Sequence, residues 1–230
     1  MKAYIIGDKN NQVSIKAMNG FANTMSHFKT SWTIELIQQT SPETLDKDLH
    51  PFPGLEWNFP INDEIRIDKS GMVLQGYRTN NVKKVFACLI SHARLWIRCV
   101  KLNEPIMVFE HDAKLIRPFA PDFEWEGGGL GLNDPRGATF NSVKYHKMIA
   151  NKGEGVHFAP YVTDLSRPQG LAGNSAYNIK PFAAKELLEK LKETGGWPND
   201  ALMCNQHFGW VKVLYPYATS LQRVRSTTTL

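Results

Sequence analysis

The sequence predicts an α/β protein with one mixed, mostly parallel sheet flanked by helices. Residues 1–40 have the pattern of a strand, a helix and a second strand, which is typical of a parallel βαβ unit. Residues 82–113 contain a long amphipathic helix followed by a short, wholly apolar strand. The chain has 230 residues and ordinary apolar content, so we expect residues 1–230 to form a single domain.

The first forty residues supply the βαβ unit. Residues 3–6 form a short apolar run that Gly7 and Asp8 end, and this predicts a core strand. Apolar residues recur on one helical face over residues 13–25, and residues 31–39 alternate as in a strand. Residues 41–81 are polar and contain four prolines, so we expect a long irregular connection. Its aromatic residues should pack onto the body of the protein.

The central stretch is the most informative part of the chain. Apolar residues at three- and four-residue spacing predict a helix over residues 82–100, and Asn103 to Pro105 interrupt it. The apolar run 106–109 predicts a buried strand, which Glu110, His111 and Asp112 follow. In open α/β sheets, ligands bind beyond the carboxyl ends of the strands. These acids are therefore candidate site residues.

Glycine and proline residues indicate where the later elements begin and end. Residues 127–131 are rich in glycine and are expected to form a mobile loop, and residues 156–162 and 174–179 are candidate strands. Pro181 should open a helix that Gly195 ends. Asn199 is a candidate cap for a helix over residues 200–208, and a strand is expected over 211–215.

Composition limits the possible partners and the compartment. The net charge of +5 and the pI near 9.0 favour nucleotides, nucleic acid or anionic surfaces as partners. No apolar run approaches the roughly 20 residues of a membrane span. The N-terminus turns polar too early for a signal peptide, so we expect a cytoplasmic protein. Three cysteines without framework spacing are expected to be reduced.

Glu110 and Asp112 are candidate ligands for a hard cation. Two carboxylates at a strand end can hold Mn²⁺ or Mg²⁺ through oxygen, and such an ion can bridge the phosphates of a nucleotide sugar. A solvated acidic turn is the alternative. Gly128 and Gly129 could lie against a phosphate or a sugar, because glycine allows close approach of the backbone. A simple flexible loop explains these glycines equally well.

Two further groups of residues have both a chemical and a structural interpretation. Asp200 is a candidate general base, or else an acid that interacts with a helix dipole, and His207 could complete a metal or phosphate site. Cys88 with His92, and Cys204 with His207, have helical spacing and could together bind zinc. Cysteine is also common as a small buried residue, and His92 could simply be a hydrogen-bonded histidine at the edge of a helix.

Several motifs together resemble glycosyltransferase family 25, which includes lipooligosaccharide and collagen galactosyltransferases. Residues 87–96 are similar to the family's "GCxxSHxxxW" helix, and residues 107–113 to its strand ending in "EDDA". Residues 173–179 and the following helix resemble its "GxxAYxIS" segment, and residues 198–200 its "PxD". The resemblance covers roughly residues 82–215, in the order of the family. His111 stands where the family has a middle acid, and Phe86 where it has glycine.

The resemblance implies a GT-A-like fold and transfer of a sugar from a nucleotide-sugar donor to a hydroxyl group. It implies inversion and assistance by Mn²⁺ or Mg²⁺. Residues 1–81 would form the nucleotide-binding half, and residues 82–230 the half that binds metal and acceptor. The assigned residues are, for metal, Glu110, Asp112 and His207; for the donor, Ser91, His92, Glu110, Gly128 and Gly129; and for catalysis, Asp200.

The acceptor and the activity itself have alternatives. The acceptor is expected to be a glycan or, given the basic chain, hydroxymethylated bases in DNA, as for some phage enzymes that work in the host cytoplasm. From another class, the protein could be a non-catalytic binder of sugars or nucleotides, because His111 leaves one carboxylate fewer in the acidic motif. A protein stabilised by structural zinc is a further alternative.

Overall fold

A seven-stranded mixed sheet forms the centre of the protein, with the strand order β2-β1-β5-β9-β7-β10-β8. We describe a computed structural model, which covers residues 1–30, 32–120, 123–138 and 141–224. β1 pairs in parallel with β2 and β5, β9 runs antiparallel to β5 and β7, and β10 is parallel to β7 and antiparallel to β8. Five of the seven strands therefore run in one direction, which confirms the predicted mostly parallel α/β sheet.

The helices and strands follow one another along the whole chain. In the first half they are β1 (Lys2–Gly7), α1 (Gln12–His27), β2 (Ile34–Gln38), α2 (Leu45–Asp48), β3 (Ile65–Ile67), β4 (Val73–Gln75), α3 (Val82–Leu102), β5 (Ile106–Glu110) and β6 (Ala113–Leu115). In the second half they are β7 (Gly129–Gly131), a short 3-10 turn η1 (Pro135–Gly137), α4 (Ser142–Ala150), β8 (Gly155–Phe158), β9 (Ala176–Ile179), α5 (Pro181–Thr194), α6 (Asn199–Leu202), β10 (Val211–Tyr215) and β11 (Thr219–Leu221).

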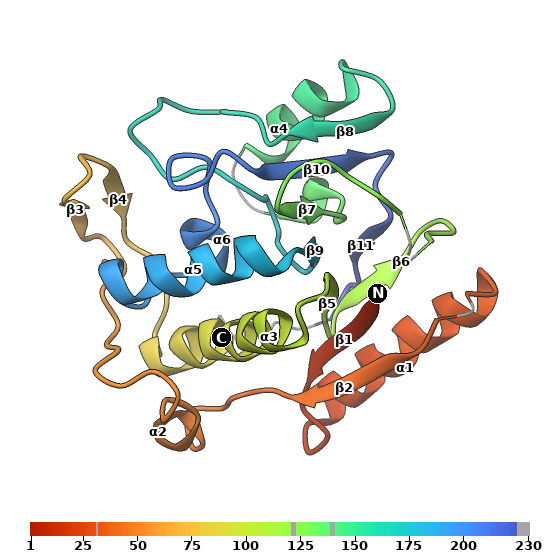
Figure 1. Ribbon diagram of the computed structural model, residues 1–230, viewed down its shortest axis with the longest axis horizontal. Coiled ribbons are helices and arrows are strands. Elements are labelled where there is room, and N and C mark those ends of the chain that lie inside the picture. The colour runs from red at the N-terminus through yellow and green to blue at the C-terminus, as the bar shows by residue number, and fades with distance from the viewer. Residues whose placement is uncertain (31, 121–122, 139–140, 225–230) are drawn as a thin grey trace.

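Alternate residues of the central strands enter two separate hydrophobic cores. In β5, Ile106 and Val108 pack with α3 and α5, whereas Met107 and Phe109 pack on the opposite face with Phe21 of α1. This period of two is what a strand buried on both faces requires. Figure 1 shows α3 and α5 side by side across one face of the sheet, and α1 lies beside β1 and β6.

Most predicted elements are confirmed. The β1–α1–β2 unit is parallel as predicted, although Ser31, the first residue of the predicted second strand, lies outside the described residues. α5 begins at Pro181 and its C-cap is Gly195, as the proline and glycine predicted. The connection over residues 41–81 is largely irregular and packs through buried Phe52 and Phe59. It also contains the short α2 and the antiparallel pair β3–β4, which the sequence did not predict.

Two predictions about local structure were wrong. The helix expected over residues 200–208 ends at Leu202, because the backbone of Gln169 holds the following segment by accepting a hydrogen bond from the Asn205 N–H. The expected mobile loop at 127–131 contains β7, a buried strand between β9 and β10. The indole of Trp210 covers Gly129 so closely that a Cβ atom there would lie 2.7 Å from it.

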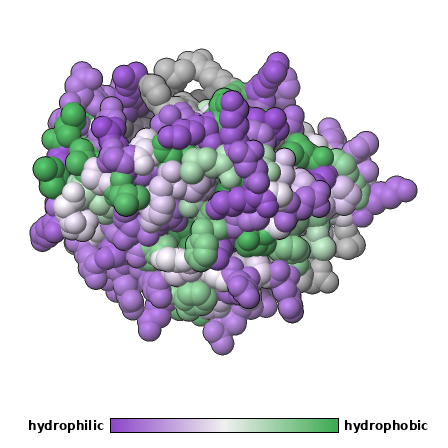
Figure 2. Space-filling model, turned by 90° about the horizontal axis from the view of Figure 1, so that it is seen from above, coloured by the Kyte–Doolittle hydropathy of each residue, from purple (hydrophilic) through white to green (hydrophobic). Residues whose placement is uncertain are grey.

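On the face shown in Figure 2, hydrophilic residues predominate and apolar residues are scattered among them. None of the described helices combines the length and apolarity needed to cross a bilayer. Cys88, Cys99 and Cys204 are free thiols, as predicted.

The packing of Trp210 on β7 gives a prediction about stability. Gly129→Ala should lower the free energy of unfolding by about 1–3 kcal/mol, because the added methyl group must displace the indole. Gly209→Ala is the matched control, since a Cβ atom there meets no atom within 4 Å and the change should stay within about 0.5 kcal/mol. Urea unfolding of both variants measures the difference. Equal stability of the two variants would contradict the packing described.

Candidate functional site

The candidate site lies where β5 ends, beside the end of β1. Glu110 is the last residue of β5, and its backbone is in register with Ile6 of β1. The Glu110 N–H donates to the Ser175 carbonyl at 2.7 Å, which fixes the strand end against the segment that enters β9. The side chain of Glu110 keeps 30% of its surface exposed. The strand therefore brings one carboxylate from the core to the solvent.

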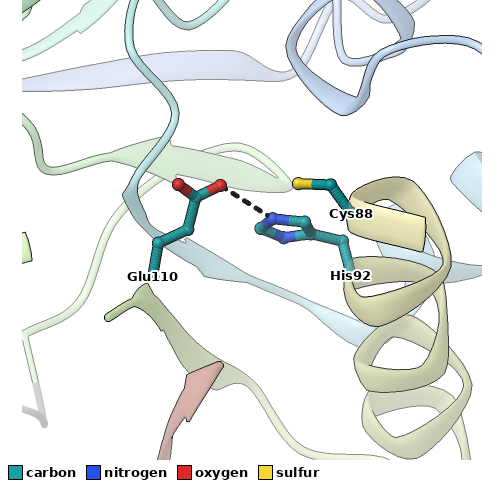
Figure 3. A group of neighbouring side chains, drawn as sticks. All are labelled: Cys88, His92 and Glu110. Atoms are coloured by element: carbon teal, nitrogen blue, oxygen red, sulfur yellow. Dashed lines mark hydrogen bonds and ion pairs between the residues drawn. The ribbon is translucent and has the colours of Figure 1, made fainter. Parts of the chain in front are cut away.

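A buried chain of hydrogen bonds holds this carboxylate. His92 Nε2 lies 3.0 Å from Glu110 Oε1, and His92 Nδ1 lies 3.0 Å from the Tyr177 hydroxyl. The Trp96 indole N–H donates to the same hydroxyl at 2.9 Å. His92 and Trp96 are one turn apart on α3, and neither is exposed to solvent. Figure 3 shows His92 pointing from α3 toward Glu110, with Cys88 one turn before it.

The hydrogen-bond donors in this chain determine its direction. Trp96 can only donate, so the Tyr177 oxygen accepts from it. The buried Tyr177 hydroxyl then satisfies its own hydrogen by donating to His92 Nδ1, which leaves the imidazole hydrogen on Nε2. His92 is thus a neutral donor to the Glu110 carboxylate. Glu110 Oε2 is left for another partner.

Asp112 brings a second carboxylate to the same strand end. Its Oδ1 is buried and has no hydrogen-bond partner among the residues that the structure describes. Burial and the nearby charge of Glu110 raise the pKa of Asp112 to about 7. Between them, His111 is buried, and this burial lowers the pKa of its imidazole. Glu110 therefore lies close enough for its charge to oppose the ionisation of Asp112.

Asp200, Tyr77 and Cys88 border these acids. The Asp200 side chain is open to solvent, yet the protein that surrounds it desolvates the carboxylate and raises its pKa, with a further contribution from Glu110. Burial and the charges of Asp200 and Glu110 raise the pKa of the Tyr77 hydroxyl, so it stays protonated. Burial, followed by the charges of Glu110 and Asp200, raises the pKa of the Cys88 thiol. The predicted base Asp200 thus lies near two of the three predicted metal ligands, Glu110 and Asp112.

Ser91 precedes His92 on α3, and its hydroxyl is hydrogen-bonded within the protein. Its hydroxyl accepts the Thr40 N–H at 2.8 Å and donates to the Ala87 carbonyl at 2.9 Å. The side chain is buried, so both of its hydrogen-bonding functions are used in joining α3 to the segment after β2. The role in donor binding assigned to Ser91 stays a prediction, and this geometry offers it no free group.

The structure does not bring Gly128, Gly129 or His207 to the acids. Gly129 of β7 is in register with Ile179 of β9, and Ile179 is in register with Ile106 at the start of β5. That is four residues, or about 13 Å, from Glu110. The His207 ring packs on Trp197, and its Nδ1 lies 3.2 Å from the Leu202 carbonyl. The charges that affect the pKa of His207 are those of Lys190, Asp68 and Glu193, and the site carboxylates are not among them.

Two groups of the site, Tyr77 and Tyr177, were given no role from the sequence. Tyr77 lies in the irregular connection, and only the packing of that segment brings its hydroxyl near Asp200 and Glu110. Tyr177 stood out as part of a strand, but its contact with His92 joins residues 85 positions apart. A buried tyrosine on the face of β9 toward α3 was the available hint, since its hydroxyl needs a partner.

The carboxylates fit the hard cation that the resemblance implies. Mn²⁺ and Mg²⁺ take oxygen ligands, and the buried, unpartnered Oδ1 of Asp112 is an oxygen that lacks a positive partner. Glu110 Oε2 adds a second oxygen that the hydrogen bond from His92 leaves free. Within the described part of the chain, the charge that acts on the pKa of Asp112 is the carboxylate of Glu110.

Comparison with known proteins confirms the family resemblance. The family model described as "Glycosyltransferase family 25 (LPS biosynthesis protein)" matches residues 62–123. This segment includes α3, β5, Glu110 and Asp112. A search of curated proteins gave no match.

Two solved structures have a distant likeness to the chain. One is a mutant Drosophila β-1,4-galactosyltransferase 7 in complex with manganese, UDP-Gal and xylobiose, with 9% identity, a TM-score of 0.42, and coverage of 99% of this chain and 68% of that chain. The other is galactosyltransferase LgtC in complex with donor and acceptor sugar analogs, with 9% identity, a TM-score of 0.43, and coverage of 97% and 87%. Both scores are too low to transfer a property of either protein to this chain.

The raised pKa of Asp112 predicts how the stability of the metal-free protein depends on pH. The folded state keeps the Asp112 proton up to about pH 7, whereas the unfolded chain loses it near the ordinary value of 3.8. Stability from this group therefore falls as pH rises through that window. The free energy of unfolding of Asp112→Asn should therefore rise relative to that of the wild type by on the order of 1 kcal/mol or more between about pH 5 and about pH 8.

Urea unfolding in the presence of a chelator measures this gain. Asp63→Asn changes an exposed aspartate and should show no gain with pH. A constant difference between wild type and Asp112→Asn across this range would show that Asp112 ionises normally in the folded protein.

Proposed function

Because part of the chain matches glycosyltransferase family 25, we propose that the protein transfers a sugar from a nucleotide-sugar donor to a hydroxyl acceptor at the Glu110–Asp112 site. One observation carries this proposal: the matched segment contains two carboxylates at a strand tip, one of them with a buried oxygen that has no hydrogen-bond partner among the described residues. A divalent cation bound there would neutralise the diphosphate of the donor and stabilise it as a leaving group. Glu110 and Asp112 would hold that cation.

His92 acts through Glu110 in this proposal. Its Nε2–H fixes Oε1, so that the carboxylate presents Oε2 in one orientation without relying on a mobile side chain. Tyr177 and Trp96 set the direction of the hydrogen bond from within the core. Because both nitrogens of His92 are engaged, it serves as a positioning residue for the hard cation and is not one of its ligands.

Asp200 is the proposed general base. One of its oxygens accepts the Ala201 N–H at 3.0 Å, and the carboxylate faces solvent beside Glu110 and His92. The acceptor hydroxyl gives its proton to Asp200 as its oxygen bonds to the anomeric carbon. The bond from that carbon to the phosphate oxygen breaks with its electron pair, and the nucleoside diphosphate leaves. Attack opposite the leaving group inverts the anomeric centre.

Both halves of the chain contribute to the proposed site, in keeping with a single domain over residues 1–230. Tyr77, from the first half, keeps its proton and offers a hydroxyl donor to a sugar bound between Asp200 and Glu110. We give Gly128, Gly129 and His207 no part in transfer, because the sheet register and the packing on Trp197 hold them elsewhere.

A basic hollow beside the site favours DNA with hydroxymethylated bases as a second candidate acceptor, next to a glycan. The hollow has a volume of about 640 Å³, and its charged lining residues are Lys114, Arg223 and Arg136, the last of which is paired with Asp134 in the same wall. It adjoins the site, since Gln222 from its wall donates its N–H to the Asp112 carbonyl. Lysine and arginine in such a place would contact backbone phosphates.

Donor and metal requirements test the proposed activity. A panel of nucleotide sugars with Mn²⁺, offered glycans and hydroxymethylated DNA, should reveal one donor that is consumed, and a chelator should abolish its consumption. Glu110→Gln and Asp112→Asn should each lower kcat by at least about 100-fold. Transfer of radiolabelled sugar measures this. The alternative of a binding protein would be favoured by donor binding without turnover, and the proposal fails if no nucleotide binds at all.

Removal of the proposed base gives a more specific prediction. Asp200→Asn should lower kcat by about 10²–10⁴-fold with little change in KM for the donor, because the donor does not need the base to bind. Asp46→Asn is the matched control, an exposed aspartate in the first turn of another four-residue helix. It should keep the activity of the wild type. If both variants are equally active, Asp200 is not the base.

A further inference from the structure

Cys88, His92 and Glu110 bring three different donor atoms together. Cys88 and His92 lie one turn apart on α3, and Glu110 reaches them from the end of β5 (Figure 3). The sulfur, the ring nitrogen and the carboxylate oxygen all lie within 4.8 Å of one another. In a tetrahedral zinc site, such atoms are about 3.4–3.6 Å apart. A shift of about 1 Å therefore suffices to close these side chains around an ion.

The charges around these residues favour a cation. The charges that raise the pKa of the Cys88 thiol are the carboxylates of Glu110, Asp200 and Asp112. They belong to β5, to α6 and to the turn after β5. His92 is neutral and buried between Tyr177 and Glu110. Tyr77, from the long connection, also faces these charges with a protonated hydroxyl. Cys88 and Glu110 are partly exposed, so an ion can reach the group from solvent.

We propose that Cys88, His92 and Glu110 form a second metal site that binds Zn²⁺ and thereby inhibits the protein. Sulfur and nitrogen ligands select zinc over Mn²⁺ and Mg²⁺, which take oxygen. The site differs from the Glu110–Asp112 pair in two of its ligands but shares Glu110 with it. Zinc and the hard cation therefore compete for one carboxylate. The metal site stands on the geometry of the three side chains, whereas inhibition of transfer rests on the function proposed above.

Zinc binding changes the protons of the buried network in a defined way. Cys88 loses its thiol proton to solvent as the sulfur–zinc bond forms, so about one proton is released for each ion. His92 binds through Nε2 and stays neutral, with its hydrogen on Nδ1. The Tyr177 oxygen then accepts from both His92 and Trp96, and its own hydrogen loses its partner. This loss weakens zinc binding, and we expect the ion to bind reversibly and not as a permanent structural metal.

Cobalt provides a test of the metal site that does not depend on activity. Co²⁺ titrated into metal-free protein should produce the near-ultraviolet absorption of a cobalt–thiolate bond, and Zn²⁺ should remove it. Cys88→Ala should abolish the absorption. The control is Cys99→Ala, which removes a buried cysteine further along α3, and it should keep the absorption. Circular dichroism confirms that both variants are folded. The site is disproved if the wild type lacks the band or Cys88→Ala retains it.

Competition for Glu110 is tested separately with bound Mn²⁺. Zn²⁺ added to the Mn²⁺-loaded protein should release Mn²⁺, seen by electron paramagnetic resonance, and should inhibit transfer in a manner that excess Mn²⁺ relieves. Cys88→Ala should keep its basal activity and be at least about ten-fold less sensitive to Zn²⁺. Equal sensitivity of the two proteins would overturn the inhibition. A cobalt signal that needs Cys88, without transfer from any donor, would support the metal site and contradict the proposed function.

Discussion

The hydrogen bond from His92 to Glu110 is the contact on which the rest of the site depends. It joins the longest helix, α3, to the central strand β5 at the point where that strand meets solvent. Behind it, Tyr177 and Trp96 form a buried chain in which each donor has one acceptor. A low-dielectric interior strengthens such a chain when every group is satisfied. The carboxylate therefore has a fixed orientation before any ligand arrives.

The parts of the fold that could be predicted are those with local causes. An apolar run bounded by glycine marks β1, and Pro181 and Gly195 mark the two ends of α5, because these residues restrict the backbone wherever they occur. The acids after β5 could be picked out because a strand buried on both faces has no other reason to end in charge. The same rule led to Glu110 and Asp112, which the structure places beside Asp200.

The parts that could not be predicted depend on contacts between distant segments. β9 inserts antiparallel between β5 and β7, and no local pattern states which strands become neighbours. Gly129 was taken for part of a loop because the covering Trp210 lies 81 residues later in the chain. Cys204 and His207 do not share a helical face, because α6 ends at Leu202. The donor atom beside Cys88 and His92 comes from Glu110 on β5.

The choice of cation follows from how many hydrogen bonds of the buried Trp96–Tyr177–His92–Glu110 chain each metal must break. Glu110 has two oxygens, and His92 uses only Oε1, so a hard ion on Oε2 and Asp112 leaves the buried chain intact. Such an ion also offsets the repulsion by which Glu110 raises the pKa of Asp112. A zinc ion on the sulfur side must instead replace the Nε2 hydrogen and turn the Tyr177 hydroxyl. The rigidity that orients Glu110 thus also favours the hard ion, because only the softer metal has to rearrange the core.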